Sequence, residues 1–82
     1  MNNCPLDKQI SQQISQALPG AGVIVTSPDN IHFYAEVTYE GFRDKTIVAQ
    51  HRLVYAAIKD LLTSETVHAL KLDTKTPGAN ND

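Results

Sequence analysis

The clearest pattern in the chain is a strict alternation of apolar and polar residues between Ile31 and Tyr39. The apolar set is Ile31, Phe33, Ala35, Val37 and Tyr39, and the polar set is His32, Tyr34, Glu36 and Thr38. Successive side chains of a β-strand point to opposite faces, so a period of two indicates a strand with one buried and one exposed face. We therefore predict a strand over Ile31–Tyr39 that carries His32 on its polar face.

An amphipathic helix and a second strand are predicted before this one. Apolar residues recur at helical spacing from Leu6 to Leu18, and glutamine and serine residues cover the opposite side. Pro5 suits the first position of a helix, and Pro19–Gly20 ends it. The stretch Gly22–Ser27 is short and rich in β-branched residues, and turn-forming residues follow it. It is predicted to pair with the alternating strand as a hairpin.

The second half of the chain is predicted to form a helical segment and a last strand. Residues at helical spacing are Ile47, His51, Val54, Ile58 and Leu61. Asp44 is the expected N-cap, and the segment should end near Thr63. In Thr66–Thr74, Leu70 and Leu72 fall on one face of a strand and the intervening residues on the other.

These elements predict one small α+β domain. A chain of 82 residues has room for a single core, so the domain spans residues 1–82, with residues 1–4 and 77–82 expected to be flexible. The order is helix, strand, strand, helical segment, strand. Because one strand is polar at alternate positions, we expect a three-stranded mixed sheet with the helices packed on one face.

Composition narrows the classes of function. Seven Lys and Arg against nine Asp and Glu give a formal net charge of -2, which provides no overall basic field for nucleic acid or anionic lipid. The single cysteine, Cys4, has no partner for an internal disulfide and is expected to be inert. No leader and no apolar stretch of membrane-spanning length is evident, so the expected compartment is the reducing cytoplasm.

No recognised catalytic motif is present. The chain lacks a recognisable Ser, His and Asp set, a His-Glu-x-x-His motif, a P-loop and a dinucleotide fingerprint. We therefore expect a binding protein and not an enzyme.

Three histidines, His32, His51 and His68, are the candidate ligands for a transition metal. His32 is expected to be exposed beside a turn, where most histidines are simply surface residues. His68 begins the last strand in phase with Leu70, where it either faces a partner or covers the core. His51 lies on the apolar stripe of the helical segment, which favours a structural role.

Four basic residues lie on or near the helical segment and are the candidates for contact with phosphates. They are Arg43, Lys45, Arg52 and Lys59. Arg52 and Lys59 are two helical turns apart on one face, but Asp44 and Asp60 dilute the positive field. An ordinary solvated helix face explains the same pattern.

Four stretches of the chain together resemble the BolA family. They are His32–Val37, Tyr39–Lys45, Gln50–Tyr55 and Val67–Leu72. The combination of His-Arg-Leu-Val with a later Val-His-Ala-Leu is the most specific part. The sequence departs from many members of the family after Thr76–Pro77, where Gly78–Ala79 replaces an acidic pair and a Trp.

The resemblance implies an αββααβ fold similar to the class II KH fold. In such a fold two helices divide the helical segment, and we expect the division near His51–Leu53. No Gly or Pro marks it.

The resemblance also implies a function as a partner of a monothiol glutaredoxin. The two proteins would share a [2Fe–2S] cluster with thiolates from glutaredoxin and glutathione, for cluster assembly, transfer or iron sensing. His68 of the last strand matches the family's ligand, and His32 is the best match to a second ligand. The isolated protein is expected to be a cluster-free monomer.

Two alternatives remain open. Some BolA-like proteins are described as transcriptional regulators of stress or morphology responses, which implies contact of Arg43, Lys45, Arg52 and Lys59 with DNA. The chain has no Gly-x-x-Gly clamp of the KH type, and its net acidity opposes strong nonspecific binding. The other alternative is a domain that binds only protein, with structural histidines.

Overall fold

The computed structural model describes residues 5–29, 31–64, 67 and 69–78. The elements in this part of the chain are α1 (Leu6–Ala17), β1 (Gly22–Thr26), β2 (His32–Thr38), the short 3-10 helix η1 (Glu40–Phe42), α2 (Ile47–Ala57), α3 (Lys59–Thr63) and β3 (Ala69–Lys75). The α+β class and the αββααβ order are therefore confirmed.

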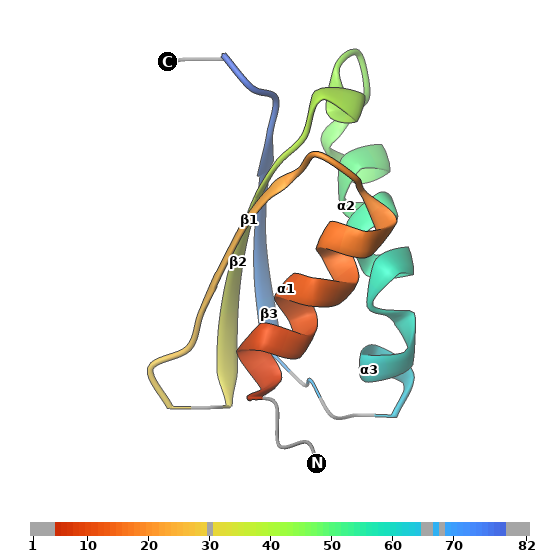
Figure 1. Cartoon of the computed structure of the whole chain (residues 1–82). Helices are drawn as coiled ribbons and strands as arrows, with labels where there is room; N and C mark the ends of the chain where they lie inside the picture. The colour runs from red at the N-terminus through yellow and green to blue at the C-terminus, as the bar shows by residue number, and fades with distance from the viewer. Residues whose placement is uncertain (1–4, 30, 65–66, 68, 79–82) are drawn as a thin grey trace.

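The strands form one mixed sheet with β2 in the middle. β1 pairs with β2 antiparallel, and β3 pairs with β2 parallel. A parallel pair needs a long crossover connection, which α2 and α3 provide. Figure 1 shows the strands as one layer and the helices as a second layer on one side of it. The expected packing of the helices on a single face of the sheet is confirmed.

The core lies between these two layers. The alternation in β2 is confirmed, because Phe33, Ala35 and Val37 are buried and His32 and Tyr34 are exposed. The helices contribute the other large buried side chains, which include Ile10, Ile14, Val54, Ile58 and Leu61. Complete burial of a side chain of this size stabilises the fold by about 1.5–3 kcal/mol.

Ile31 does not belong to the buried face that the alternation suggests. It is 60 % exposed and precedes the strand, which begins at His32. The amide of Ile31 donates to the Asp29 carboxylate, so this residue is part of the turn. The period of two thus extends one residue beyond the strand itself.

The helical segment divides at Ile58, and the expected division near His51–Leu53 is wrong. Ile58 leaves the helical region of backbone space with φ -114° and ψ 26°. Its side chain stays completely buried, and its carbonyl accepts from the amide of Leu62. The chain therefore turns at Ile58 while the isoleucine side chain stays packed in the core. Because an isoleucine makes this break, no Gly or Pro marks it in the sequence.

The N-cap of α2 is Thr46, and the prediction of Asp44 is wrong. The Thr46 hydroxyl oxygen accepts a hydrogen bond from the amide of Ala49 at 3.1 Å. Asp44 has φ +67° and lies in the turn after η1. A left-handed backbone is tolerated by aspartate better than by most residues, so Asp44 shapes the turn and does not begin the helix.

A buried amide connects α2 with β3 and with the turn after η1. The Gln50 side-chain nitrogen donates to the carbonyls of Lys45 at 2.9 Å and Phe42 at 3.3 Å. Its oxygen accepts from the Thr74 hydroxyl at 2.5 Å. Buried polar groups are costly unless paired, and these three bonds pair the Gln50 amide.

The expected flexible ends lie mostly outside the described residues, which exclude residues 1–4 and 79–82. Pro77 and Gly78 form a turn in which Gly78 has φ +79°. None of the helices in the described ranges has the length and apolar character that a membrane span needs.

Candidate metal-ligand site on the open face of the sheet

The face of the sheet opposite the helices carries the more exposed alternate positions of the strands, which include the apolar Ile24 on β1. In the register, Tyr34 lies across from Thr26 on β1 and from Lys71 on β3, and Glu36 lies across from Asp73. Cross-strand partners share a face, so these side chains form one surface. The Lys75 ammonium lies 3.2 Å from the Glu36 carboxylate on this surface.

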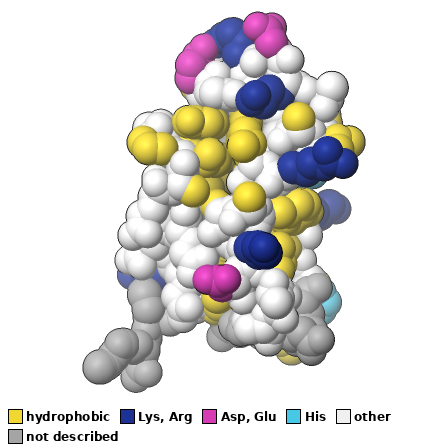
Figure 2. Space-filling model, turned by 90° about the vertical axis from the view of Figure 1, so that its right-hand side faces the viewer, with side chains coloured by type: hydrophobic (Ala, Val, Ile, Leu, Met, Phe, Trp, Pro, Cys, Tyr) yellow, Lys and Arg dark blue, Asp and Glu magenta, His cyan; other side chains and the backbone are white. Residues whose placement is uncertain are grey.

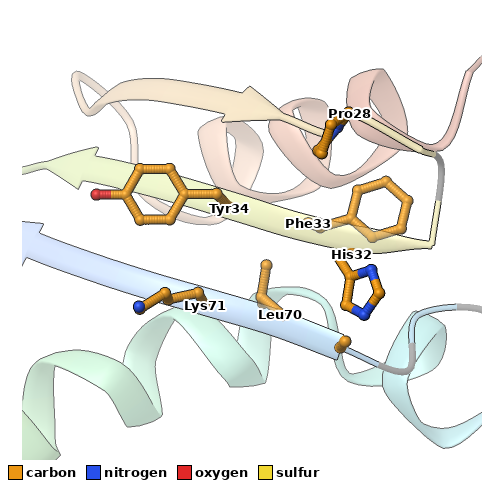
Figure 3. Close-up of a pocket in the computed structure, with 7 residues that line it drawn as sticks. Pro28, His32, Phe33, Tyr34, Leu70 and Lys71 are labelled. Carbon is orange, nitrogen blue, oxygen red and sulfur yellow. The ribbon is translucent and has the colours of Figure 1, made fainter.

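A hollow lies where β2 and β3 begin. Its lining residues are Pro28, His32, Phe33, Tyr34, Ala69, Leu70 and Lys71, and its volume is about 510 Å³. Figure 3 shows the His32 ring between the beginnings of the two strands, with Tyr34 and Lys71 further along them. The lining of the hollow therefore combines apolar residues with one imidazole and one ammonium group.

The turn before β2 fixes where His32 lies. The Asp29 Oδ1 atom accepts from the amides of Ile31 at 2.9 Å and His32 at 2.8 Å. The Ser27 hydroxyl donates to the His32 carbonyl at 2.6 Å. Asp and Ser side chains commonly bond to nearby backbone in this way. These local bonds hold the backbone of His32 at the first position of the strand.

The second oxygen of Asp29 contacts the imidazole ring. Oδ2 lies 2.7 Å from His32 Nδ1, while the His32 side chain is 70 % exposed. The backbone amide of His32, its ring and the amide of Ile31 hold the pKa of Asp29 well below its ordinary value. Asp29 is therefore ionised near neutral pH, and an ionised carboxylate only accepts hydrogen bonds. Among the described residues, Nε2 makes no hydrogen bond or ion pair, which leaves this nitrogen available as a ligand.

The other two histidines differ from His32. His68 lies outside the described residues, so the expected pair of ligands is not tested, and Cys4 lies outside them as well. His51 is half-buried on α2 and packs edge to face against Tyr55, with ring centroids 6.2 Å apart. It does not line the hollow. A structural role for His51 stays a prediction.

A complete ligand set is not found in the part of the chain that the structure describes. No group of three or more His, Cys, Asp or Glu side chains there could hold a metal ion. The described residues bring one imidazole to the hollow. Any metal or cluster at His32 would therefore need ligands from elsewhere.

The four basic candidates are exposed, and none of them lines the hollow. Arg43 donates two hydrogen bonds to Glu40, at 2.5 and 2.8 Å. Lys45, Arg52 and Lys59 make no ion pair with the described residues. Figure 2 shows Lys and Arg side chains on the helical side of the molecule, with apolar side chains between them and acidic ones nearby. They do not form a continuous basic surface.

Two features of the surface were not predicted from the sequence. Asp29 was assigned only to a turn, although its spacing of three residues from His32 is compatible with a side-chain contact. Ile47 was assigned to the apolar stripe, but Ile47 and Val48 are each 59 % exposed at the start of α2. The first turn of a helix can extend past the core, and a periodic pattern carries no signal for this.

Comparison with known proteins places the chain among BolA-like proteins. The family model described as BolA-like protein matches residues 10–79. The chain is 32 % identical over 73 residues to the Arabidopsis thaliana protein BOLA1, chloroplastic, covering 89 % of this chain and 45 % of that relative. The chain thus spans about half the length of the curated relative it matches.

Two solved structures share both sequence and fold with the chain. A bolA protein homologue from Coxiella burnetii is 36 % identical, with a TM-score of 0.73 and 94 % of each chain covered. The BolA domain of SufE1 from Arabidopsis thaliana is 25 % identical, with a TM-score of 0.78, covering 93 % of this chain and 96 % of that one. The likeness therefore extends over nearly the whole domain.

Proposed function

The chain belongs to the BolA-like protein family, and we propose that it is a non-enzymatic partner of a monothiol glutaredoxin, with which it holds a [2Fe–2S] cluster. Members of this family generally act as regulatory or partner proteins. The isolated protein is proposed to be a cluster-free monomer. We propose the cytoplasm as its compartment, although the name of the Arabidopsis relative assigns that protein to the chloroplast.

The observation that supports this proposal best is the state of His32. Its Nδ1 lies 2.7 Å from Asp29 Oδ2 and its Nε2 makes no hydrogen bond or ion pair with the described residues, while the ring borders an open hollow. Neutral imidazole with one free nitrogen is a common ligand for iron. An exposed ligand of this kind suits a cluster that a second protein brings to the surface.

The incomplete ligand set is a reason to invoke a partner. A [2Fe–2S] cluster needs four protein or thiol ligands, and histidines in place of thiolates raise its reduction potential. In the proposed complex, glutaredoxin and glutathione supply thiolates, and His68 and His32 supply imidazoles. His68 directly precedes Ala69 in the sequence, and Ala69 is the cross-strand partner of His32.

Lys71 adds an electrostatic reason. It is exposed on the hollow and makes no ion pair with the described residues. Thiolate ligands and the carboxylates of glutathione are negatively charged, so an unpaired ammonium group beside them favours association.

A spectroscopic titration tests the proposal. Cluster-loaded monothiol glutaredoxin is titrated with this protein while visible absorption and circular dichroism are recorded. The wild type and His51→Ala, the matched control for loss of an imidazole outside the hollow, should both change the spectrum at a one-to-one ratio. His68→Ala and His32→Ala should alter or abolish that change. No spectral change and no co-elution with the wild type would refute the proposal.

A second candidate function is DNA binding in transcriptional regulation. Three of the four basic candidates, Lys45, Arg52 and Lys59, are exposed without an ion pair among the described residues and favour it. Arg43 is less suited because Glu40 pairs with it. Duplex DNA binding that weakens steeply with salt and with Arg52→Ala would support this function. Absence of binding at low salt would exclude it.

A further inference from the structure

The contact between Asp29 and His32 determines which ring nitrogen is offered to a metal. We propose that Asp29 is a positioning residue that keeps the His32 proton on Nδ1 and so presents the unprotonated Nε2 at the hollow as the ligating atom. This inference rests on the proposed function and extends it to a residue outside the ligand set.

The geometry of the Asp29 carboxylate supports this role. Both oxygens are used: Oδ1 accepts from two backbone amides, and Oδ2 lies 2.7 Å from Nδ1. The two amides fix the plane and direction of the carboxylate, so Oδ2 has little freedom to leave the ring. An ionised carboxylate only accepts hydrogen bonds, so the ring must donate through Nδ1.

The consequence concerns the other ring nitrogen. In a neutral imidazole one nitrogen carries the proton and the other carries a lone pair, so a proton on Nδ1 leaves the lone pair on Nε2. Ligating histidines in metalloproteins commonly donate their second nitrogen to a carboxylate, which sets the ring orientation and strengthens the ligand. The contact between Asp29 Oδ2 and His32 Nδ1 has this arrangement. The contact with Asp29 thus favours one orientation of the His32 ring, although the side chain is 70 % exposed.

Asp29→Asn separates this role from a role in shaping the turn. The two backbone amides need an acceptor, so the oxygen of the introduced carboxamide should take the place of Oδ1. The carboxamide nitrogen then takes the place of Oδ2 and donates to Nδ1, which forces the His32 proton onto Nε2. The variant keeps the turn and inverts the tautomer.

The decisive measurement is long-range proton–nitrogen NMR of the isolated protein labelled with 15N-histidine, at about pH 8, where imidazole is neutral. We expect His32 to be protonated on Nδ1 in the wild type and on Nε2 in Asp29→Asn. His51 in the same spectra should not change. Glu40→Gln, which removes an exposed carboxylate from another turn, should leave His32 as in the wild type. The same His32 tautomer in wild type and Asp29→Asn would overturn the inference.

The cluster titration then tests the ligating atom. Asp29→Asn should reproduce the spectral effect of His32→Ala, because a protonated Nε2 cannot ligate iron. If His32→Ala changes the spectrum of the complex and Asp29→Asn does not, Asp29 has no role in ligation and the inference fails. If neither His32→Ala nor His68→Ala changes the spectrum while the NMR result holds, the proposed ligands are wrong, but Asp29 still positions the His32 ring. The two failures are therefore distinguishable.

Discussion

At the scale of single residues, hydrogen bonds from side chains to the backbone have different roles on the surface and in the core. On the surface, Asp29 uses a carboxylate to orient His32 beside the hollow. In the core, Gln50 uses an amide to bond two carbonyls and the Thr74 hydroxyl. Water can replace a lost bond at the first position but not readily at the second. The energetic consequences of substitution should therefore differ.

Gln50→Met should destabilise the protein by about 1–3 kcal/mol, because it leaves buried polar groups without partners at nearly unchanged side-chain volume. Adding Thr74→Val removes one of those orphaned groups, so the double variant should be less destabilised than the sum of the single variants predicts. Urea unfolding followed by circular dichroism measures both effects. Additive losses in the double variant would show that the bond between Gln50 and Thr74 contributes nothing.

Glu40 provides a pH-dependent test at an exposed site. The Arg43 guanidinium, by its hydrogen bonds first and by its charge, lowers the pKa of Glu40 below the ordinary value of 4.5. Arg43→Gln should return the pKa of Glu40 toward that value in an NMR titration. Because the folded state lowers this pKa, the stabilisation is complete above 4.5 and is lost as the pH falls through the lowered value. An unchanged pKa of Glu40 in Arg43→Gln would contradict the ion pair.

At the scale of elements, periodic patterns predicted the helices and strands, but not their breaks. The alternation in β2 predicted the buried and exposed faces, and with them the exposure of His32. The division at Ile58 was misplaced, because a buried isoleucine ends one helix without any breaker residue. The role of Asp29 was missed because a turn-forming residue has the same sequence signal whether or not its second oxygen contacts a ring. The periodic pattern of a sequence therefore predicts which face of a strand or helix is buried. Contacts between particular side chains are seen only in the three-dimensional structure.

The start of α2 tests which residue caps the helix. Thr46→Ala removes the hydroxyl that accepts from the Ala49 amide and should cost about 0.5–2 kcal/mol. Asp44→Gly should be neutral or stabilising, since glycine adopts φ +67° without steric strain. Thermal and urea unfolding of the two variants provide the comparison. A larger loss for Asp44→Gly than for Thr46→Ala would restore Asp44 as the cap.

At the scale of the whole molecule, the two layers give the protein two different surfaces. The open sheet face carries the hollow with His32 and Lys71, and the helical side carries dispersed cations among exposed apolar residues (Figure 2). The proposed cluster-bridged complex uses the first surface, and the DNA-binding alternative uses the second. A charge change on one surface should therefore affect only the function that uses it.

Lys71→Glu and Lys45→Glu are a matched pair for this test, because each reverses one exposed lysine that has no ion pair among the described residues. Lys71→Glu should weaken the cluster-bridged complex by several-fold, since it adds a negative charge beside thiolate and carboxylate groups, and the loss should shrink as salt screens the charges. Lys45→Glu should leave that affinity unchanged, and both variants should unfold at wild-type urea concentrations because both side chains are exposed. Affinity is measured by titration of cluster-loaded glutaredoxin at low and high salt. Equal weakening by the two variants would mean that the partner responds to net charge alone, and weakening by Lys45→Glu only would move the binding surface to the helical side.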